Sequence, residues 1–378
     1  MSFPSTTHRA WAEVDLARLG HNLNEIRRRV GPRVEIIGVV KANAYGHGAV
    51  AVAQELQRLG LETFAVASPQ EAIELREGGV IGGILVLGCT FPFDAEAVIE
   101  SKAVVALSDP TIAAVFSKAA QWAGTRIPVH LKVDTGMGRL GVHMDEAAEF
   151  AQRLSAMPGL KLEGILTQFP SSDEDRQFTA GQIGLFNRIC SEIERLGIPI
   201  PCKHTANTGG ILEHPASHFN AVRPGIALYG YGTARDQDFR PVLSLRSRIG
   251  LVKRLHRGET VGYGRTHKVE RESLGAVVTI GYADGLSRAL SNQGEMLVRG
   301  TRCRILGRIS MDHTMIDVTD LAREKGVELA DEVVVYGEQG GERIAIEEVA
   351  ARLRTITYEV LCSIGRRVPR VYLPAPGA

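Results

Sequence analysis

The sequence predicts an α/β protein in which a TIM-like (β/α)8 barrel is followed by a smaller, mainly β domain. From about Asp15 to Tyr229, short apolar runs alternate with amphipathic stretches, the pattern of buried parallel strands joined by helices. After Arg240 and Pro241 the rhythm changes to short strands separated by Gly-rich turns. We therefore expect a barrel domain over residues 10–240 and a C-terminal β domain over 241–378, which the first ~9 residues join.

Eight strand-like runs carry the barrel prediction, because a doubly wound sheet usually needs fewer. The expected strands are 34–40, 63–67, 83–87, 103–107, 128–133, 160–167, 201–205 and 221–228. The expected helices are 49–59, 69–77, 110–124, 146–156 and 182–196. Two of these helices begin with strong signals, since Ser68-Pro69 and Asp109-Pro110 each place a capping residue before a proline at the first helical position.

The second domain is predicted from short apolar runs and turn signals such as Ala283-Asp284-Gly285. Its expected strands are 243–255, 275–280, 295–298, 302–309, 314–318 and 332–336, and its expected helices are 346–353 and 358–364.

Composition and charge favour a small-molecule substrate. The 378 residues carry 44 Lys and Arg against 43 Asp and Glu, a net charge of +1, which gives no broad attraction for nucleic acid or an anionic membrane. Five scattered cysteines without a C-x-x-C pair indicate reduced thiols. The most apolar stretch, 80–91, is interrupted by glycines and is shorter than the ~20 residues of a membrane span. No secretory signal is visible, so we expect a cytoplasmic protein.

Catalytic side chains of a barrel lie at the carboxyl ends of its strands. The first strand ends at Lys41, within VVKANAYGHG. This lysine is either a strand-end residue that reaches solvent or a nucleophilic amine able to form a Schiff base.

The fifth strand leads into a G-x-G-x-x-G pattern at Gly136, Gly138 and Gly141, with Glu163 further on, which is the dinucleotide-binding fingerprint. Its place on the fifth strand and the intervening Arg139 weigh against that interpretation. An arginine in such a loop suits a carboxylate or phenolate oxygen.

The last two barrel strands end in HTANTGG and AVRPGIALYG, where small residues and backbone N–H groups suit a phosphate. Arg223 there is either a structural ion-pair residue or a contact to a ligand heteroatom. In the second domain, tyrosines lie in the Gly-rich segments VGYGRT and GYADG, and Met311 lies in ISMDH. Such tyrosines are usually packing residues. No histidine spacing typical of a metal site is found, and we predict no metal.

Taken together, VVKANAYGHG, VHLKVDTGMGRLG, HTANTGG, RPGIALYG, VGYGRT, GYADG and ISMDH resemble the signature of the alanine racemase family over nearly the whole chain. The resemblance implies a pyridoxal 5'-phosphate barrel with a C-terminal β domain, working as a head-to-tail homodimer with shared active sites. It also implies an isomerase that interconverts L- and D-alanine, with supply of D-alanine for peptidoglycan as its role.

The resemblance assigns residues as well. Lys41 would carry the cofactor and act as one catalytic base, and Tyr263 of the other subunit would act as the second. The remaining cofactor contacts would be Tyr45, Arg139, Asn207, Thr208, Arg223, Gly225, Ile226 and Tyr358. Arg139 and Met311 would contact the substrate, Arg223 would face the pyridine nitrogen with His204 behind it, and Lys132 matches a position carbamylated in some members. Asp312 would lie near Tyr263, and the entrance would comprise Asp173, Tyr282, Arg288, Arg308 and Ile356.

One departure from the family pattern is Gln168, in GILTQFPSSDE, where the family usually has histidine. A planar amide either substitutes adequately for imidazole or weakens cofactor packing and alters the substrate range. A serine or broad-specificity racemase is the alternative function. The tyrosine in VGYGRT disfavours a decarboxylase of the same fold, and the β domain and its tyrosines disfavour a non-catalytic cofactor carrier. A dehydrogenase, which rests on the G-x-G-x-x-G pattern, ranks last.

Overall fold

The computed structural model describes residues 7–232 and 238–374. Contacts divide the chain into two compact units, one spanning Ala17–Pro241 and the other joining Val242–Ala378 to the residues up to Leu16. Strand β1 (Ala10–Asp15) belongs to the second unit, because it pairs with strands of that unit's sheet. The barrel unit therefore begins after β1 rather than at residue 10.

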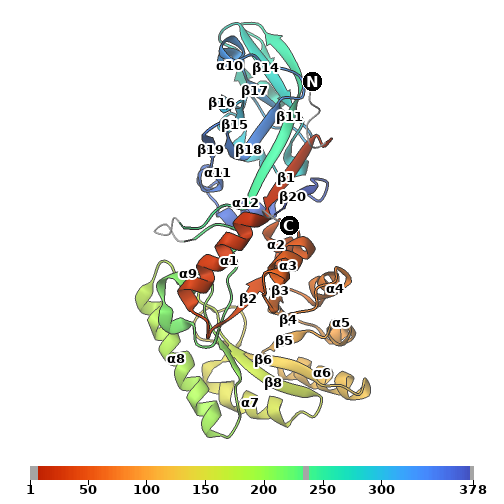
Figure 1. Cartoon of the computed structure of the whole chain (residues 1–378), viewed down its shortest axis with the longest axis vertical. Coiled ribbons are helices and arrows are strands. Elements are labelled where there is room, and N and C mark those ends of the chain that lie inside the picture. The colour runs from red at the N-terminus through yellow and green to blue at the C-terminus, as the bar shows by residue number, and fades with distance from the viewer. Residues whose placement is uncertain (1–6, 233–237, 375–378) are drawn as a thin grey trace. The chain divides into compact units, whose positions relative to one another are not determined.

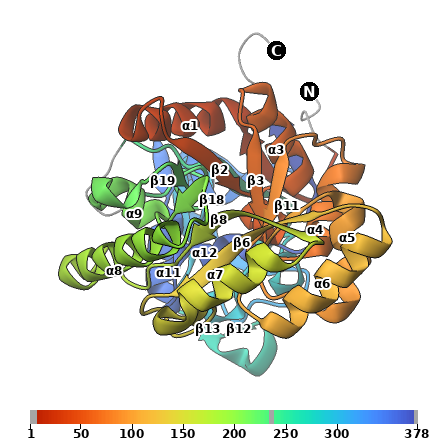
Figure 2. The ribbon, with the colours of Figure 1, turned by 90° about the horizontal axis from the view of Figure 1, so that it is seen from below.

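The first unit is a closed barrel of eight parallel strands, as the sequence predicts. The ring closes because the fourth strand in chain order pairs with the fifth as well as with the third. Its strands are β2 (Glu35–Val39), β3 (Thr63–Val66), β4 (Gly83–Val86), β5 (Val104–Leu107), β6 (Ile127–Asp134), β8 (Leu160–Leu166), β9 (Cys202–His204) and β10 (Ala221–Val222). The short strand β7 (Val142–His143) pairs in parallel with the end of β6. Figure 2 looks onto the barrel end, with helices around the strands.

The barrel helices lie outside the strands (Figure 1). They are α1 (Leu16–Val30), α3 (Ala49–Arg58), α4 (Pro69–Glu77), α5 (Ala95–Ser101), α6 (Pro110–Trp122), α7 (Ala147–Ala156), α8 (Arg176–Arg195) and α9 (Thr208–Glu213). Both predicted capping residues function as such, since Ser68 accepts from Glu71 N–H and Asp109 from two N–H groups of α6. Apolar side chains such as Phe116, Phe150 and Phe186 form a core between helices and strands.

Two sequence expectations about the barrel are wrong in detail. The predicted strand 221–228 ends at Val222, because Pro224 cannot donate to a ladder and the chain turns, with Leu228 N–H bonded to Gly225 O. Helix α8 begins at Arg176 instead of residue 182, because Asp175 caps it by accepting from the Phe178 N–H at 2.9 Å.

The second unit is built on a mainly antiparallel sheet in the order β16-β15-β18-β11-β1-β20, with β14 pairing with both β11 and β17. Its strands after β1 are β11 (Leu243–Leu255), β12 (Thr260–Val261), β13 (His267–Lys268), β14 (Ser273–Val278), β15 (Glu295–Val298), β16 (Thr301–Arg304), β17 (Thr314–Asp317), β18 (Glu332–Gln339), β19 (Glu342–Ile344) and β20 (Arg370–Leu373). Its helices are α10 (Thr319–Glu324), α11 (Ile346–Leu353) and α12 (Thr357–Cys362). The mainly β domain is confirmed.

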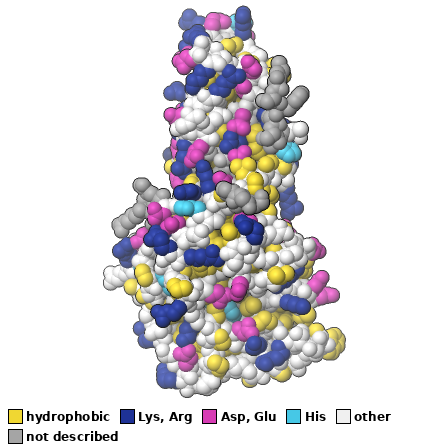
Figure 3. Space-filling view, in the orientation of Figure 1, with side chains coloured by type: hydrophobic (Ala, Val, Ile, Leu, Met, Phe, Trp, Pro, Cys, Tyr) yellow, Lys and Arg dark blue, Asp and Glu magenta, His cyan; other side chains and the backbone are white. Residues whose placement is uncertain are grey.

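The surface carries mixed charge. On the face shown in Figure 3, acidic and basic side chains are interspersed over both units, as a net charge of +1 suggests. Among the described residues, no helix has the length and apolar character needed to cross a membrane.

Candidate active site

Lys41 lies at the carboxyl end of β2 and opens an unusual turn. Residues Ala42, Asn43, Ala44 and Tyr45 all have φ between 52° and 54°, so the segment α2 (Lys41–Tyr45) is a left-handed turn built without glycine. Each such L-residue costs roughly 1–2 kcal/mol. Strain of this size is retained only where surrounding contacts impose it, and it is typical of functional sites.

Glu71 of α4 supplies part of that restraint. Its carboxylate accepts the Ala42 N–H at 2.7 Å and the Ala67 N–H at 2.6 Å. Asn43 adds a second restraint, because its Oδ1 accepts the Ala49 N–H at 2.9 Å. The backbone beside Lys41 is therefore tied to the loop after β3 and to the start of α3.

Arg223, directly after β10, is 3% exposed and pairs with no carboxylate in the described part of the chain. Its Nη1 donates to His204 Nδ1 at 2.7 Å and to His204 O at 2.8 Å. Its Nη2 donates to the carbonyls of Thr167 and Thr205 and to Gln168 Oε1 at 3.1 Å. Within the described residues the Nε–H has no partner. A buried cation is thus held by neutral acceptors.

Gln168 contributes directly to this arrangement, since its side-chain oxygen is an acceptor for the arginine. Its backbone oxygen accepts from Gln182 Nε2 at 3.3 Å. The amide that departs from the family pattern therefore has a defined hydrogen-bonding role beside Arg223.

Lys132 projects from β6 close to the same cation. Its Nζ donates to Leu87 O at 2.8 Å, and the side chain is buried. Burial first, and then the charges of Arg223 and Arg139, lower the pKa of Lys132 to about 8. A small cavity of about 70 Å3 adjoins it, lined by residues at the ends of β4 and β5. About one tenth of this amine is consequently uncharged at pH 7.

The G-x-G-x-x-G loop after β6 folds around the carboxylate of Asp134. Asp134 Oδ1 accepts the Gly136 and Met137 N–H groups at 2.8 Å each, and Oδ2 accepts the Gly138 N–H at 2.9 Å. These N–H groups are the ones that a pyrophosphate would need. These donors are occupied by Asp134, so the dinucleotide interpretation is wrong.

The ends of β9 and β10 form a cup of small groups. A Cβ on Gly225 would lie only 2.5 Å from the Tyr45 hydroxyl oxygen, and the Thr208 hydroxyl accepts the Ala227 N–H at 3.3 Å. Asn207 caps α9 by accepting the Gly210 N–H at 3.0 Å. The first N–H groups of a helix have no partner within it. The barrel thus brings Tyr45, Asn207, Thr208, Gly225 and Ile226 to one end, a setting suited to an anion.

The remaining predicted residues lie in the second unit. Tyr263, Met311 and Tyr282 are 70%, 52% and 43% exposed, which is high for large apolar side chains. Asp312 pairs with Arg367 at 2.6 Å. Tyr358 lies at the start of α12 and is 39% exposed. Of the predicted entrance residues, Arg288, Arg308 and Ile356 belong to this unit and Asp173 belongs to the barrel. Ile356, the residue before α12, is 62% exposed.

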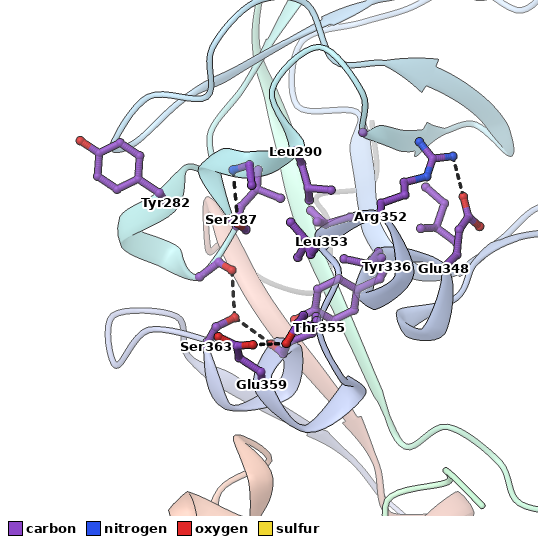
Figure 4. Close-up of a pocket in the computed structure, with 18 of the residues that line it drawn as sticks. Tyr282, Ser287, Leu290, Tyr336, Glu348, Arg352, Leu353, Thr355, Glu359 and Ser363 are labelled. Carbon is purple, nitrogen blue, oxygen red and sulfur yellow. Dashed lines mark hydrogen bonds and ion pairs between the residues drawn. The ribbon is translucent and has the colours of Figure 1, made fainter. Parts of the chain in front are cut away.

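The second unit also contains a cavity of about 330 Å3 between α11, α12 and the sheet (Figure 4). Apolar side chains such as Leu290 and Leu353 line it, with the Arg352–Glu348 ion pair among its polar groups. In Figure 4, Tyr282 points away from the other labelled side chains. Neither Tyr263 nor Met311 lines the cavity, so it does not form the site that the sequence predicts.

The sequence did not predict three residues that hold parts of the site in place. They are Glu71 beside Lys41, Asp134 beneath the Arg139 loop, and His130, whose Nδ1 lies 2.8 Å from His204 Nε2. The S-x-x-E pattern Ser68–Glu71, which is typical of a capping box, was a usable signal for Glu71.

One group of possible metal ligands occurs in the described residues. Donor atoms of His130, Cys202 and His204 lie within 4.8 Å of one another. His204 uses one ring nitrogen with Arg223 and the other with His130, so a metal held by these residues would have to displace at least one of these two hydrogen bonds.

Fold and site together define a class of protein: a barrel enzyme with a companion β domain, a lysine at the end of its first strand and a cup of small groups after its last two strands. Family models match both parts, the alanine racemase N-terminal domain over residues 14–233 and the alanine racemase C-terminal domain over 242–372. The chain belongs to the alanine racemase family, and it is accordingly an isomerase.

Individual relatives agree over nearly full length. The chain is 42% identical to alanine racemase 2 of Caldanaerobacter subterraneus subsp. tengcongensis, covering 96% of this chain and 94% of the relative. It superposes on the alanine racemase of Bacillus anthracis with bound L-Ala-P (TM-score 0.91, 34% identity, 98% and 96% coverage). A third similar protein is the alanine racemase of Bartonella henselae with covalently bound pyridoxal phosphate (TM-score 0.86, 30% identity, 97% and 100% coverage).

Proposed function

We propose that this chain interconverts L- and D-alanine with pyridoxal 5'-phosphate as cofactor. The observation that carries the proposal is Arg223, a buried cation without a carboxylate partner whose Nε–H is left for a ligand. An always-charged donor suits the unprotonated nitrogen of a pyridine ring. Lys41 at the first strand end would hold the cofactor, and Tyr45, Thr208, Gly225 and Ile226 would hold its phosphate.

When bound, pyridoxal phosphate supplies an electron sink for the charge left on an amino acid that loses its α-proton. Racemisation additionally needs one acid/base group on each face of the α-carbon. Lys41 would exchange a proton on one face and Tyr263 on the other. Arg139 would hold the substrate carboxylate by charge-assisted hydrogen bonds. The loop that carries Arg139 is bound to Asp134, which would fix the position of the arginine.

Lys132 would support Arg139 as a carbamate. Its lowered pKa, about 8, leaves an uncharged amine that can attack carbon dioxide. The new N–C bond converts the amine to an anionic carbamate and releases one proton. A negative charge there would pair with Arg139, whereas an ammonium would repel it.

We further infer a homodimer in which Tyr263, Met311 and Asp312 of one protomer complete the site of its partner. The support is that Tyr263 and Met311 are large side chains left more than half exposed. Mixing Lys41→Ala with Tyr263→Phe protein should restore activity, because one of the two sites in a heterodimer is then intact. Heterodimers that remain inactive would contradict shared sites.

The physiological setting follows from the same proposal. An enzyme of this kind would work in the cytoplasm and supply D-alanine for peptidoglycan.

The decisive test is racemisation of L-alanine and L-serine by the purified protein loaded with pyridoxal phosphate, with the D-isomers separated by chiral chromatography. Faster formation of D-alanine is expected. Dominant D-serine would instead favour the serine or broad-specificity alternative, and the absence of any D-isomer would refute the proposal.

A further inference from the structure

We infer that His130 is a positioning residue that locks the tautomer of His204 and thereby the hydrogen bonding of Arg223. The three side chains form a continuous buried chain across the barrel: Arg223 Nη1 lies 2.7 Å from His204 Nδ1, and His204 Nε2 lies 2.8 Å from His130 Nδ1. The inference extends the proposed function, since it concerns how the arginine that would face the cofactor is held.

The direction of these hydrogen bonds follows from the donors alone. A guanidinium can only donate, so His204 Nδ1 must accept and the proton of a neutral ring must reside on Nε2. That Nε2–H then points at His130 Nδ1, which must accept in turn and leaves the proton of His130 on its own Nε2. If the proton were on Nδ1 of either histidine, two N–H donors would face each other across that hydrogen bond.

Burial, helped by the charge of Arg223, keeps both rings neutral. His130 and His204 are 7% and 0% exposed. Burial first, and the Arg223 charge second, lower the pKa of His130 to about 4 and that of His204 well below its usual value. Neutral rings are the state that the bonding pattern requires.

The backbone is adapted to hold the His130 ring. The β6–β8 ladder shifts register between Val129 and His130, which places His130 opposite Gly164. A Cβ on Gly164 would lie 2.8 Å from the His130 ring atoms Nε2 and Cδ2. A side chain at Gly164 would therefore displace the ring.

The far side of His130 reaches a cavity of about 660 Å3 at the opposite end of the barrel, where the strands begin. His130 lines this cavity together with charged residues such as Arg126 and Glu163. Water there can satisfy the outer Nε2–H. The hydrogen-bonded chain thus ends at this cavity.

Without an acceptor at position 130, the Nε2–H of His204 would be buried and unsatisfied, which is unfavourable. His204 would then gain by moving its proton or turning its ring, and either change removes the acceptor for Arg223. The expected result is a misoriented Arg223 and weaker cofactor binding.

The test compares His130→Leu with His130→Asn, because an asparagine Oδ1 can replace the accepting Nδ1 whereas leucine cannot. His218→Asn is the matched control. His218 is also buried in the barrel, but it bonds to Ile211 O and takes no part in the Arg223–His204–His130 series. We expect His130→Leu to weaken pyridoxal phosphate binding about fivefold. His130→Asn and the control should stay within about twofold of the unaltered protein.

A second readout is independent of cofactor and activity. Nitrogen-15 NMR of histidine-labelled, cofactor-free protein should show the His204 proton on Nε2, with the signal changed in His130→Leu and retained in His130→Asn. A proton on Nδ1 in the unaltered protein overturns the inference, as does equal cofactor affinity in all three proteins. Failure of the unaltered protein to bind pyridoxal phosphate would instead refute the proposed function and leave the NMR test intact.

Discussion

Substituting Asp134 by asparagine should destabilise the loop that presents Arg139. Asp134 Oδ1 accepts from Gly136 and Met137, and Oδ2 accepts from Gly138 at 2.9 Å. Asparagine keeps one oxygen but loses the charge and turns an N–H2 group toward the Gly138 donor. Hydrogen bonds to a charged group are worth ~1.5–3 kcal/mol each, so we expect a loss of about 2–3 kcal/mol in unfolding free energy at pH 7.

The stability difference between the two proteins should also depend on pH. Burial alone would raise the pKa of Asp134, but the backbone N–H groups of Gly136, Gly138, Met137 and Arg139 outweigh it and lower the pKa. A carboxylate with a lowered folded pKa contributes its stability above the unfolded value, about 3.9. That contribution is lost as pH falls through the folded pKa, so the advantage over the asparagine variant should shrink below about pH 4.

Urea unfolding of the cofactor-free protein at pH 7 and at stepwise lower pH measures both effects. Asp145→Asn is the control, because that carboxylate is 83% exposed. A difference at pH 7 no larger than the control's, or one that does not change on acidification, would refute the reasoning.

Three further predictions concern other parts of the site. Ala42→Gly should raise the unfolding free energy by about 0.5–1 kcal/mol in urea, because glycine accepts the left-handed conformation without strain; a loss of stability would contradict this. With carbon-13 bicarbonate, NMR should show a carbamate signal that grows between pH 7 and 9 as Lys132 loses its proton. The signal should be absent from Lys132→Arg, and a signal that persists in that variant would exclude Lys132 as its source. Gln168→Leu should lower cofactor affinity about fivefold through loss of the acceptor for Arg223, while Gln168→His should stay within twofold; equal affinity for all three would remove this role.

Much of the fold was predictable because its signals are local. Alternating apolar runs locate every barrel strand, and Ser68-Pro69 and Asp109-Pro110 fix the starts of α4 and α6. Helix α1 was missed because its buried face includes Asn22, a polar residue on the core side. Asn22 is satisfied by the carbonyls of Leu228 and Arg240, partners about two hundred residues away that only the folded chain identifies.

The candidate site divides in the same way. Lys41, Arg139 and Arg223 end or follow strands, where barrel geometry makes side chains functional. His130 lies within a strand and meets His204 only because the barrel closes and the β6–β8 ladder shifts register. No spacing along the chain encodes that contact.

The central claim, racemisation by two bases on opposite faces, is tested most directly by converting L-alanine in deuterium oxide and following the α-position by mass spectrometry. If Lys41 and Tyr263 act on opposite faces, the incoming proton comes from the group that did not accept the outgoing one. Early D-alanine should then carry solvent deuterium while the remaining L-alanine stays unlabelled. D-alanine that retains its original α-proton would contradict the account.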